Sequence, residues 1–388
     1  MGDVVKPNME KAKFYRSVYW TGDYKTGQLF MVDQPKLPAS FETITCTDAE
    51  AVAKCIKTMV VRGAPAIGAA GSYGMYLAVK EGSYAEAKDV VEALKKAKTM
   101  LDASRPTAVN LSWATKRILE LIEAKAKGGA KPDQLKKLVW EEATQICDED
   151  VAINKRLGKF GADLIPGGTP DKPTNLLHHC NTGRLATVDY GTALGIIYTL
   201  QEQKKNIHVY VDETRPRLQG ARLTAWELQQ AGIPQHLICD SSSGFLMRKG
   251  MIDVCVFGAD RVTANGDVAN KIGTYMLSIA AKENDVKVYC ACPTSTIDLS
   301  LKSGDDIEIE QRGQDEVTGL TIDATKGQIA PTGVPVTNYA FDVTPAKYLT
   351  AIVTEEMVCY PPFEKSLAEA VAKAKARLAT SRAEQKSA

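Results

Sequence analysis

The stretch that decides the fold runs His178-His179-Cys180-Asn181-Thr182-Gly183-Arg184-Leu185-Ala186-Thr187 and continues into Tyr190-Gly191-Thr192-Ala193-Leu194-Gly195. It predicts a short strand over 175–179, a tight polar turn, and a helix rich in small residues. Gly183 permits a positive φ and Asn181 tolerates one, so we expect the turn to expose backbone N–H groups. A helix N-terminus beyond it would favour an anion and the thiolate form of Cys180. The alternative is a buried structural cysteine at a strand end.

Length and composition are those of a globular protein large enough for two domains, with 388 residues, 44% of them hydrophobic and 24% charged. The net charge of +1 provides no basis for binding nucleic acid or an anionic membrane. The sequence has no secretory signal and no apolar run of the roughly 18 residues that a membrane span needs. Nine cysteines without a Cys-x-x-Cys or zinc-ligand spacing favour a reducing, cytoplasmic location.

Residues 1–160 are predicted to form a mostly helical N-terminal domain with a small β-meander over 13–46. A helix should begin after Asp48, and amphipathic helices are expected over 85–102 and 132–158. Proline and glycine are frequent from Ile165 to Thr174, so 161–174 is the predicted linker.

Two arginines in this region precede helices. Arg62 is followed by Gly63-Ala64-Pro65, and proline is well suited to the first turn of a helix. Gly68, Ala69 and Gly71 would let that helix pack tightly. Arg105 precedes Pro106 and another helix. A guanidinium beside free helical N–H groups can clamp a phosphate, although a solvated loop arginine is the alternative at both positions.

From residue 175 onwards, strand and helix patterns alternate, which predicts a mainly parallel, doubly wound sheet in a Rossmann-like domain over 175–388. The expected strands are 175–179, 206–212, 235–239, 254–257, 287–292 and 338–342. The expected helices are 187–202, 218–231, 242–249, 270–284, 345–356 and a final one at about 364–383. No Gly-x-Gly-x-x-Gly follows the first strand and no Walker motif occurs, so nothing supports a dinucleotide cofactor.

Ligands of open parallel sheets bind beyond the carboxyl ends of the strands, and here those ends are polar. Asp260 follows the apolar run 254–259, so we expect a partly desolvated carboxyl suited to donating a proton, or alternatively a cap or an ion pair with Arg261. Asn270 and Lys271 enter the next predicted helix, where they could hold hydroxyl and phosphate groups.

Six segments in this order resemble the methylthioribose-1-phosphate isomerase family, which is related to the α, β and δ subunits of translation initiation factor 2B. They are Arg62-Gly63-Ala64-Pro65-Ala66-Ile67-Gly68, Arg105-Pro106-Thr107-Ala108-Val109-Asn110, Cys180-Asn181-Thr182-Gly183, Gln219-Gly220-Ala221, Gly258-Ala259-Asp260-Arg261 and Asn270-Lys271-Ile272-Gly273-Thr274. The resemblance extends from about residue 13 to 362.

The resemblance implies an aldose–ketose isomerase of methionine salvage that converts 5-methylthioribose 1-phosphate to 5-methylthioribulose 1-phosphate without metal or cofactor. It implies catalytic roles for Cys180 and Asp260, with Asp260 as proton donor, and a homodimer. By motif, it assigns substrate binding to Arg62, Gly63, Ala64, Arg105, Gln219, Asn270 and Lys271. Two alternatives are an isomerase of ribose 1,5-bisphosphate and a non-catalytic regulatory subunit.

Overall fold

The computed structural model describes residues 15–106, 108–322 and 325–387. Thr107 of the second family motif and residues 13–14 of the expected β-meander lie outside this part of the chain. The chain forms two compact units, Met1–Ala152 with Gly183–Gly191, and Ile153–Thr182 with Thr192–Ala388. The long helix α5 (Pro132–Asp163) passes from the first unit into the second and extends beyond the expected end at 158. The predicted division into an N-terminal domain over 1–160, a linker over 161–174 and a C-terminal domain over 175–388 stays a prediction.

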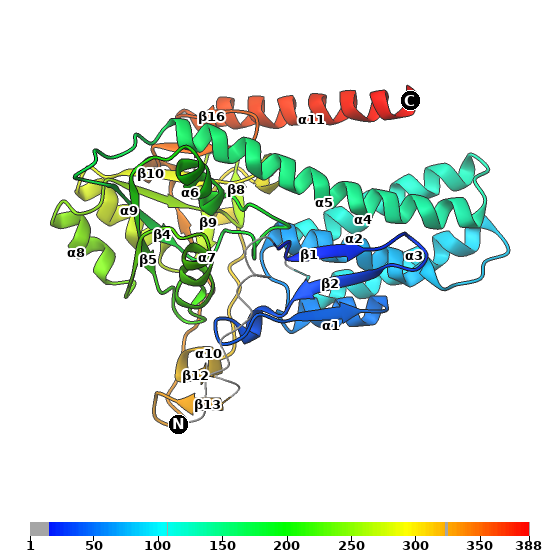
Figure 1. The fold of residues 1–388 in the computed structure, drawn as a ribbon, viewed down its shortest axis with the longest axis horizontal. Coiled ribbons are helices and arrows are strands. Elements are labelled where there is room, and N and C mark those ends of the chain that lie inside the picture. Colours follow the sequence, from blue (N-terminus) through cyan, green and yellow to red (C-terminus); the bar gives the residue numbers. More distant parts are fainter. Residues whose placement is uncertain (1–14, 107, 323–324, 388) are drawn as a thin grey trace. The chain divides into compact units, whose positions relative to one another are not determined.

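The first unit combines a three-stranded antiparallel sheet with a helical bundle (Figure 1). Its strands are β1 (Val18–Thr21), β2 (Gln28–Val32) and β3 (Thr43–Cys46). Its helices are α1 (Ala49–Lys57), α2 (Ala64–Lys80), α3 (Ala87–Ser104), α4 (Val109–Lys127) and the first part of α5. Asp48 caps α1 by accepting a hydrogen bond from the Ala51 N–H, which confirms the predicted helix start.

Small residues bring α2 and α4 together, as predicted. A Cβ added to Gly68 would lie 2.9 Å from the Asn110 carbonyl oxygen, and one added to Gly71 would lie 2.3 Å from Leu111 Cδ1. The backbone contact leaves no room for a side chain at Gly68, and a side chain at Gly71 would require Leu111 to shift. Because Gly68 and Asn110 lie in the first turns of their helices, the starts of α2 and α4 are neighbours.

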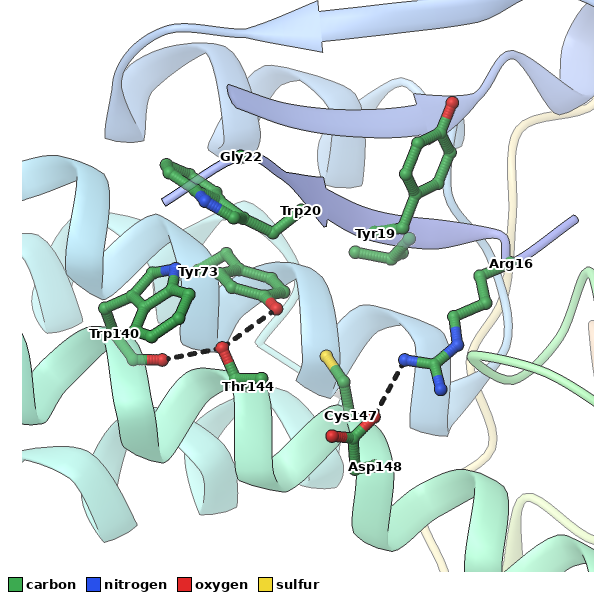
Figure 2. A pocket seen from close by; sticks show the side chains of 10 residues that line it. Arg16, Tyr19, Trp20, Gly22, Tyr73, Trp140, Thr144, Cys147 and Asp148 are labelled. Atoms are coloured by element: carbon green, nitrogen blue, oxygen red, sulfur yellow. Dashed lines mark hydrogen bonds and ion pairs between the residues drawn. The ribbon is translucent and has the colours of Figure 1, made fainter. Parts of the chain in front are cut away.

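The first unit also holds a pocket of about 340 Å³. Figure 2 shows aromatic side chains of β1, α2 and α5 around it, together with an ion pair in which Arg16 Nη1 lies 2.8 Å from Asp148 Oδ1. Its described lining includes Trp20, Tyr73 and Trp140 but none of the residues predicted to bind substrate.

The second unit is built on a seven-stranded sheet with the order β16-β15-β10-β7-β4-β5-β6. All strands except the edge strand β16 run parallel, which confirms the predicted fold class. The strands are β4 (Thr174–His179), β5 (Ile207–Asp212), β6 (Gln235–Ile238), β7 (Val254–Phe257), β10 (Lys287–Ala291), β15 (Ala351–Val353) and β16 (Val358–Cys359).

Helices connect and cover these strands (Figure 1). They are α6 (Ala193–Glu202), a π-helical turn (Gly220–Thr224) leading into α7 (Ala225–Gln230), α8 (Ser242–Arg248), α9 (Thr274–Glu283), the short α10 (Asp315–Thr318) and α11 (Phe363–Ser387). Helices α8, α9 and α11 pack on the face of the sheet that carries Leu177, Cys255 and Phe257. None of the helices in the described ranges combines the length and the hydropathy that crossing a bilayer requires.

A second, smaller sheet was not predicted. Its order is β11-β8-β9-β14, and a separate hairpin pairs β12 (Gly319–Ile322) with β13 (Thr325–Gln328). The strands of the smaller sheet are β8 (Arg261–Thr263), β9 (Val268–Lys271), β11 (Ile297–Asp298) and β14 (Phe341–Thr344). The strand predicted over 338–342 therefore lies at Phe341–Thr344, and it belongs to this sheet rather than to the larger one.

Three predicted helices need correction. The helix expected over 187–202 begins only at Ala193, because Tyr190 and Gly191 have φ values of 72° and 86°. The helix expected over 270–284 begins at Thr274, since 268–271 forms strand β9. The segment 345–356 is a short 3-10 turn followed by β15, where pairing with β10 overrides the helical signal of Thr344-Pro345.

Candidate active site

The larger sheet reverses its strand order between β4 and β7. From β4 the chain proceeds outward to β5 and β6, then returns to β7 and proceeds the other way to β10 and β15. The carboxyl ends of two such strands form the crevice where ligands of open parallel sheets bind. His179 pairs with Phe257 in the register of these strands, so the segments beginning at Cys180 and Gly258 leave the sheet side by side. The switch point therefore carries the predicted pair Cys180 and Asp260.

Cys180 is half-buried and has a positive φ of 69°, an unusual backbone conformation for a non-glycine residue. Two threonines hold it there. The Cys180 N–H donates to Thr214 Oγ1 at 2.9 Å, and the Thr224 hydroxyl donates to the Cys180 carbonyl at 2.6 Å. Strain that is fixed by surrounding contacts is typical of functional positions.

The expected anion cradle beside Cys180 is wrong in two respects. The positive φ falls on Cys180 itself, not on Gly183. The helix also does not follow the turn directly in the chain, because Gly183–Gly191 packs within the first unit and α6 begins only at Ala193. Thr182 Oγ1 accepts the Leu194 N–H at 3.0 Å, so that helical donor already has a protein partner.

Asn181 follows Cys180 and makes buried polar contacts, and Gln219 is buried before the π-helical turn whose last residue, Thr224, bonds to the Cys180 carbonyl. Asn181 Nδ2 donates to Glu227 Oε1 at 2.8 Å, and the Tyr198 hydroxyl donates to the other oxygen of the buried Glu227 at 3.0 Å. Gln219 is buried and leads into the π-helical turn at Gly220, where an added Cβ would lie 1.6 Å from the Asp212 carbonyl oxygen. Such π-helical turns frequently occur at functional sites.

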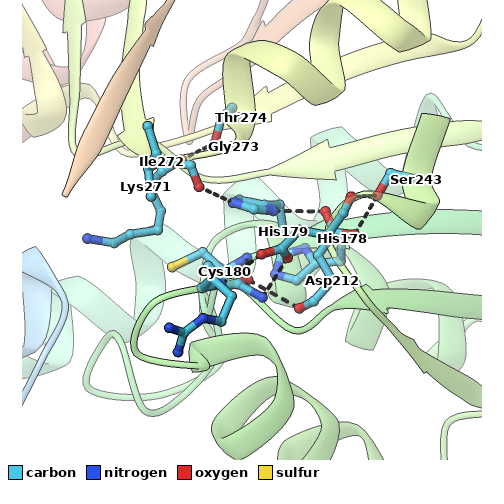
Figure 3. A network of polar contacts seen from close by, with 12 residues as sticks. His178, His179, Cys180, Asp212, Ser243, Lys271, Ile272, Gly273 and Thr274 are labelled. Carbon is cyan, nitrogen blue, oxygen red and sulfur yellow. Dashed lines mark hydrogen bonds and ion pairs between the residues drawn. The ribbon is translucent and has the colours of Figure 1, made fainter. Parts of the chain in front are cut away.

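Behind Cys180 lies the buried network of His179, Asp212 and Ser243 (Figure 3). His179 Nδ1 lies 2.8 Å from Asp212 Oδ2, and its Nε2 lies 2.9 Å from the Ile272 carbonyl oxygen. Burial disfavours charge on this imidazole, but the hydrogen bond and charge of Asp212 outweigh it and raise the pKa of His179. Ser243 donates to the remaining oxygen of Asp212.

His179, Asp212 and Asp240 together form a cluster of potential metal ligands in the described part of the chain. Its hydrogen bonds explain the cluster without an ion. Both ring nitrogens of His179 have protein partners, and the two carboxylate oxygens of Asp240 accept the N–H groups of Thr214 and Arg215 at 2.7 Å each. Asp240 thus fixes the loop that holds Cys180.

Asp260 follows β7 as predicted, but the residue is exposed, so the expected partial desolvation is wrong. Its N–H donates to the Ala269 carbonyl at 2.9 Å, which joins it to β9. Gly258 precedes it in close contact with the Cys180 turn, because an added Cβ would lie 2.7 Å from Thr182 Cγ2.

Asn270 and Lys271 end strand β9 and are buried. Asn270 Nδ2 donates to Thr274 Oγ1 at 3.0 Å, and Lys271 Nζ lies 3.7 Å from the centre of the Phe341 ring. The following N–H groups of Gly273 and Tyr275 donate to the Asp342 carboxylate at 2.7 and 3.1 Å, so these helical donors already have a protein partner. Figure 3 shows the Lys271 ammonium and the Cys180 thiol on the same side of the His179 network.

The other four predicted substrate residues belong to the first unit. Arg62, Gly63 and Ala64 form the start of α2, where Gly63 has a φ of 83°. A Cβ there would lie 2.2 Å from the Ala186 carbonyl oxygen, so only glycine fits. Arg105 follows α3 and, like Arg62, is half-buried. Since the starts of α2 and α4 are neighbours, both arginines lie at the same end of this helix pair.

Sequence reasoning missed the buried polar network, although signals were present. Two histidines end the apolar run of β4, and Glu227 lies between the apolar residues Trp226 and Leu228. Polar groups at such buried positions need partners, so each indicates a network.

Together, fold and site define a Rossmann-like α/β protein with a thiol and a carboxylate at the switch point of its sheet. A family model described as the initiation factor 2 subunit family matches residues 60–361, and the chain belongs to this family. A methylthioribose-1-phosphate isomerase of Synechococcus sp. is 49% identical, covering 91% of this chain and 97% of that protein. A methylthioribose-1-phosphate isomerase 2 of Pseudothermotoga lettingae is 48% identical with the same coverage.

Solved structures show the same fold. The 5-methylthioribose 1-phosphate isomerase of Pyrococcus horikoshii superimposes with a TM-score of 0.84 at 41% identity, covering 95% of this chain and 99% of that one. A structure described as the delta subunit of translation initiation factor eIF-2B from A. fulgidus has a TM-score of 0.80 at 42% identity, covering 92% and 99%.

Proposed function

We propose that this chain is an aldose–ketose isomerase that converts 5-methylthioribose 1-phosphate to 5-methylthioribulose 1-phosphate in methionine salvage. The observation that carries the proposal is the presence of Cys180 and Asp260 after the two strands that flank the switch point. Relatives that share almost half of their residues with this chain over nearly its whole length bear the name of this enzyme. Because fold alone does not fix function, the proposal depends on these two residues and their motifs.

The chemistry requires an acid because the substrate cannot open like an ordinary sugar. Phosphate occupies the anomeric oxygen, so breaking the ring bond at C1 does not release a free aldehyde. In our proposal the protonated Asp260 donates its proton to the ring oxygen as the bond between C1 and that oxygen breaks. The exposed carboxyl would be covered by the bound sugar, and this desolvation would favour its protonated form.

The hydrogen on C2 then moves to C1 while the C2 hydroxyl gives its proton to the Asp260 carboxylate and becomes the ketone, which regenerates the acid. Cys180 either removes the C2 proton as a base or stabilises the positive charge that develops near C1 during a hydride shift. Substrate carrying deuterium at C2 distinguishes the two routes. Deuterium retained at C1 of the product indicates a hydride shift, whereas exchange with solvent indicates a base.

We propose that the residues assigned by the family motifs bind the substrate. Arg62 and Arg105 provide guanidinium groups suited to a phosphate, and Lys271 provides an ammonium group. Asn270 and Gln219 provide amides for sugar hydroxyls. Gly63 and Ala64 bring the backbone at the start of α2 close enough to be approached by a ligand.

The first test is turnover of 5-methylthioribose 1-phosphate beside ribose 1,5-bisphosphate, with no metal added. We expect selective conversion of the first. Asp260→Asn and Cys180→Ser should each lower kcat by at least a hundredfold without loss of fold, whereas the matched control Cys239→Ser, at an exposed cysteine, should retain it. Near-normal turnover by Asp260→Asn would contradict its role, and conversion of only the bisphosphate would move the enzyme to another pathway.

A regulatory subunit is the second candidate, because the A. fulgidus relative is described as an initiation factor subunit. Such a protein acts through assembly and needs no paired thiol and carboxylate at the switch point. A folded, purified chain that converts neither sugar phosphate would favour this function.

We also propose a cytoplasmic homodimer whose interface includes the outer faces of α8 and α9. Phe245, Met276 and Ile279 on these helices are 60%, 55% and 38% exposed, and large exposed apolar side chains on adjacent helices commonly mark an interface. Light scattering should give twice the chain mass for the wild type and the single mass for Met276→Glu. A monomeric wild type would contradict the proposal. None of the nine cysteines, all of which lie in the described residues, forms a disulfide, and this fits a reducing compartment.

A further inference from the structure

The imidazole of His179 joins two parts of the site that the sequence assigns to separate motifs. His179 ends β4 directly before Cys180, and Ile272 follows Lys271 at the end of β9. The ring is 1% exposed and spans the distance between these segments. It is therefore the side chain through which the Cys180 turn and the Lys271 turn contact each other.

The acceptors around the ring fix its orientation. The Ile272 carbonyl can only accept, so His179 Nε2 carries a hydrogen and donates it over 2.9 Å. The opposite nitrogen, Nδ1, faces Asp212 Oδ2 at 2.8 Å, and Ser243 donates to the other oxygen of Asp212. Asp212 thus holds the ring by one edge while the other edge holds the Ile272 carbonyl.

Glycine lets the Lys271 turn lie directly against this ring. Gly273 has a φ of 105°, and an added Cβ would lie 2.9 Å from His179 Cε1. The next helix, α9, begins at Thr274, so the start of that helix is also fixed by the contact. A displacement of the ring would move Asn270 and Lys271 relative to Cys180.

We propose that His179 is a positioning residue that sets the placement of Lys271 and Asn270 relative to Cys180 through its hydrogen bond to the Ile272 carbonyl. The inference deepens the proposed function and rests on it for the roles of Cys180 and Lys271. Asp212 and Ser243 act one step further away, by holding the imidazole.

Two substitutions test the hydrogen bonds of the two ring nitrogens separately. The amide nitrogen of glutamine can take the place of Nε2, so His179→Gln keeps a donor for the Ile272 carbonyl and loses the contact with Asp212. The amide nitrogen of asparagine can take the place of Nδ1, so His179→Asn keeps the contact with Asp212 and loses the Ile272 carbonyl. His178→Asn is the matched control, because His178 is equally buried and its Nδ1 donates to the Val256 carbonyl on the opposite face of β4.

We expect the two His179 variants to change different properties of the protein. His179→Asn should raise the KM for 5-methylthioribose 1-phosphate at least tenfold, because the phosphate-binding turn is released. His179→Gln should keep KM within threefold of the wild type but unfold at a lower temperature, because it leaves the Asp212 carboxyl buried with one partner fewer. His178→Asn should lower the unfolding temperature without changing KM.

Hydrogen exchange measured by mass spectrometry tests the proposal without any substrate. Peptides that cover 268–283 should exchange at least fivefold faster in His179→Asn than in His179→Gln. Equal exchange together with equal KM values in the two variants would overturn the proposal. If the wild type converted no sugar phosphate, the proposed function would fail, while the exchange measurement would still decide whether His179 holds the turn. If His179→Gln did not fold, Asp212→Asn would replace it, because it weakens the same edge of the ring. If His179→Asn did not fold, Gly273→Ala would replace it, because the added Cβ presses on the edge that faces the Ile272 carbonyl.

Discussion

Replacement of Gly273 by alanine tests the contact between the Lys271 turn and the His179 ring most directly. The glycine has a φ of 105°, and the new Cβ would lie 2.9 Å from His179 Cε1 and 3.2 Å from Nε2. The imidazole cannot move away without breaking its hydrogen bonds to Asp212 or to the Ile272 carbonyl. We therefore expect Gly273→Ala to destabilise the second unit and to impair substrate binding together.

A matched control separates backbone strain from the contact. Gly250 also has a positive φ, of 66°, but nothing lies within 4 Å of an added Cβ. Placing an L-residue in this backbone region costs about 1–2 kcal/mol, which both variants incur. Overpacking a fixed neighbour costs about 1–3 kcal/mol more, which only Gly273→Ala incurs. The free energies of unfolding of the two variants should therefore differ by about 1–3 kcal/mol.

Urea unfolding at 25 °C, followed by circular dichroism, measures this difference, and steady-state kinetics measures the second effect. Gly273→Ala should raise KM at least tenfold, whereas Gly250→Ala should leave KM and kcat unchanged. If the two variants had the same stability and the same KM, the turn would not press against the His179 ring and the reasoning would be refuted.

Two further predictions concern charge. Burial raises the pKa of Asp342 from its ordinary 3.8 to about 6. Its contribution to stability is therefore complete below about pH 4 and is lost as the pH rises through 6. The loss is on the order of 2–3 kcal/mol. The urea midpoint of Asp342→Asn should therefore change less between pH 4 and 7 than that of the wild type. An unchanged pH dependence of the midpoint would show that other groups cause it. In the first unit, Arg117 is buried between Glu142 and Glu149. Arg117→Met should lower the free energy of unfolding by about 3–5 kcal/mol and leave kcat unchanged. A lower kcat in fully folded protein would contradict this purely structural role.

The fold was largely predictable because its signals are local. Apolar runs bounded by polar turns located β4, β5, β6, β7 and β10 within a residue or two. The failures occurred where tertiary contacts override local preference. Thr344-Pro345 reads as a helix start, yet the following residues pair with β10. Residues 270–271 read as the start of a helix, yet they belong to β9 and pair with β14.

The candidate site was predictable in composition but not in arrangement. Cys180 and Asp260 could be selected because polar residues follow apolar strands, and the family resemblance added the remaining residues. The expected cradle at Gly183 was wrong because residues 183–191 pack in the first unit rather than continuing into α6. Such packing depends on residues distant in sequence, such as Ala66, whose N–H donates to the Ala186 carbonyl.

The sequence by itself determined which residues this protein has available for chemistry and that a parallel sheet would bring strand ends together, since periodicity and turn residues act over a few positions. Only the tertiary structure decided that the switch point lies between β4 and β7, that Asp260 is exposed, and that His179 joins the Cys180 turn to the Lys271 turn. This is because strand order and buried hydrogen bonds depend on pairings between residues distant in the sequence, as in the contacts of His179 with Asp212 and Ile272, which lie 33 and 93 positions away. No local pattern specifies such pairings.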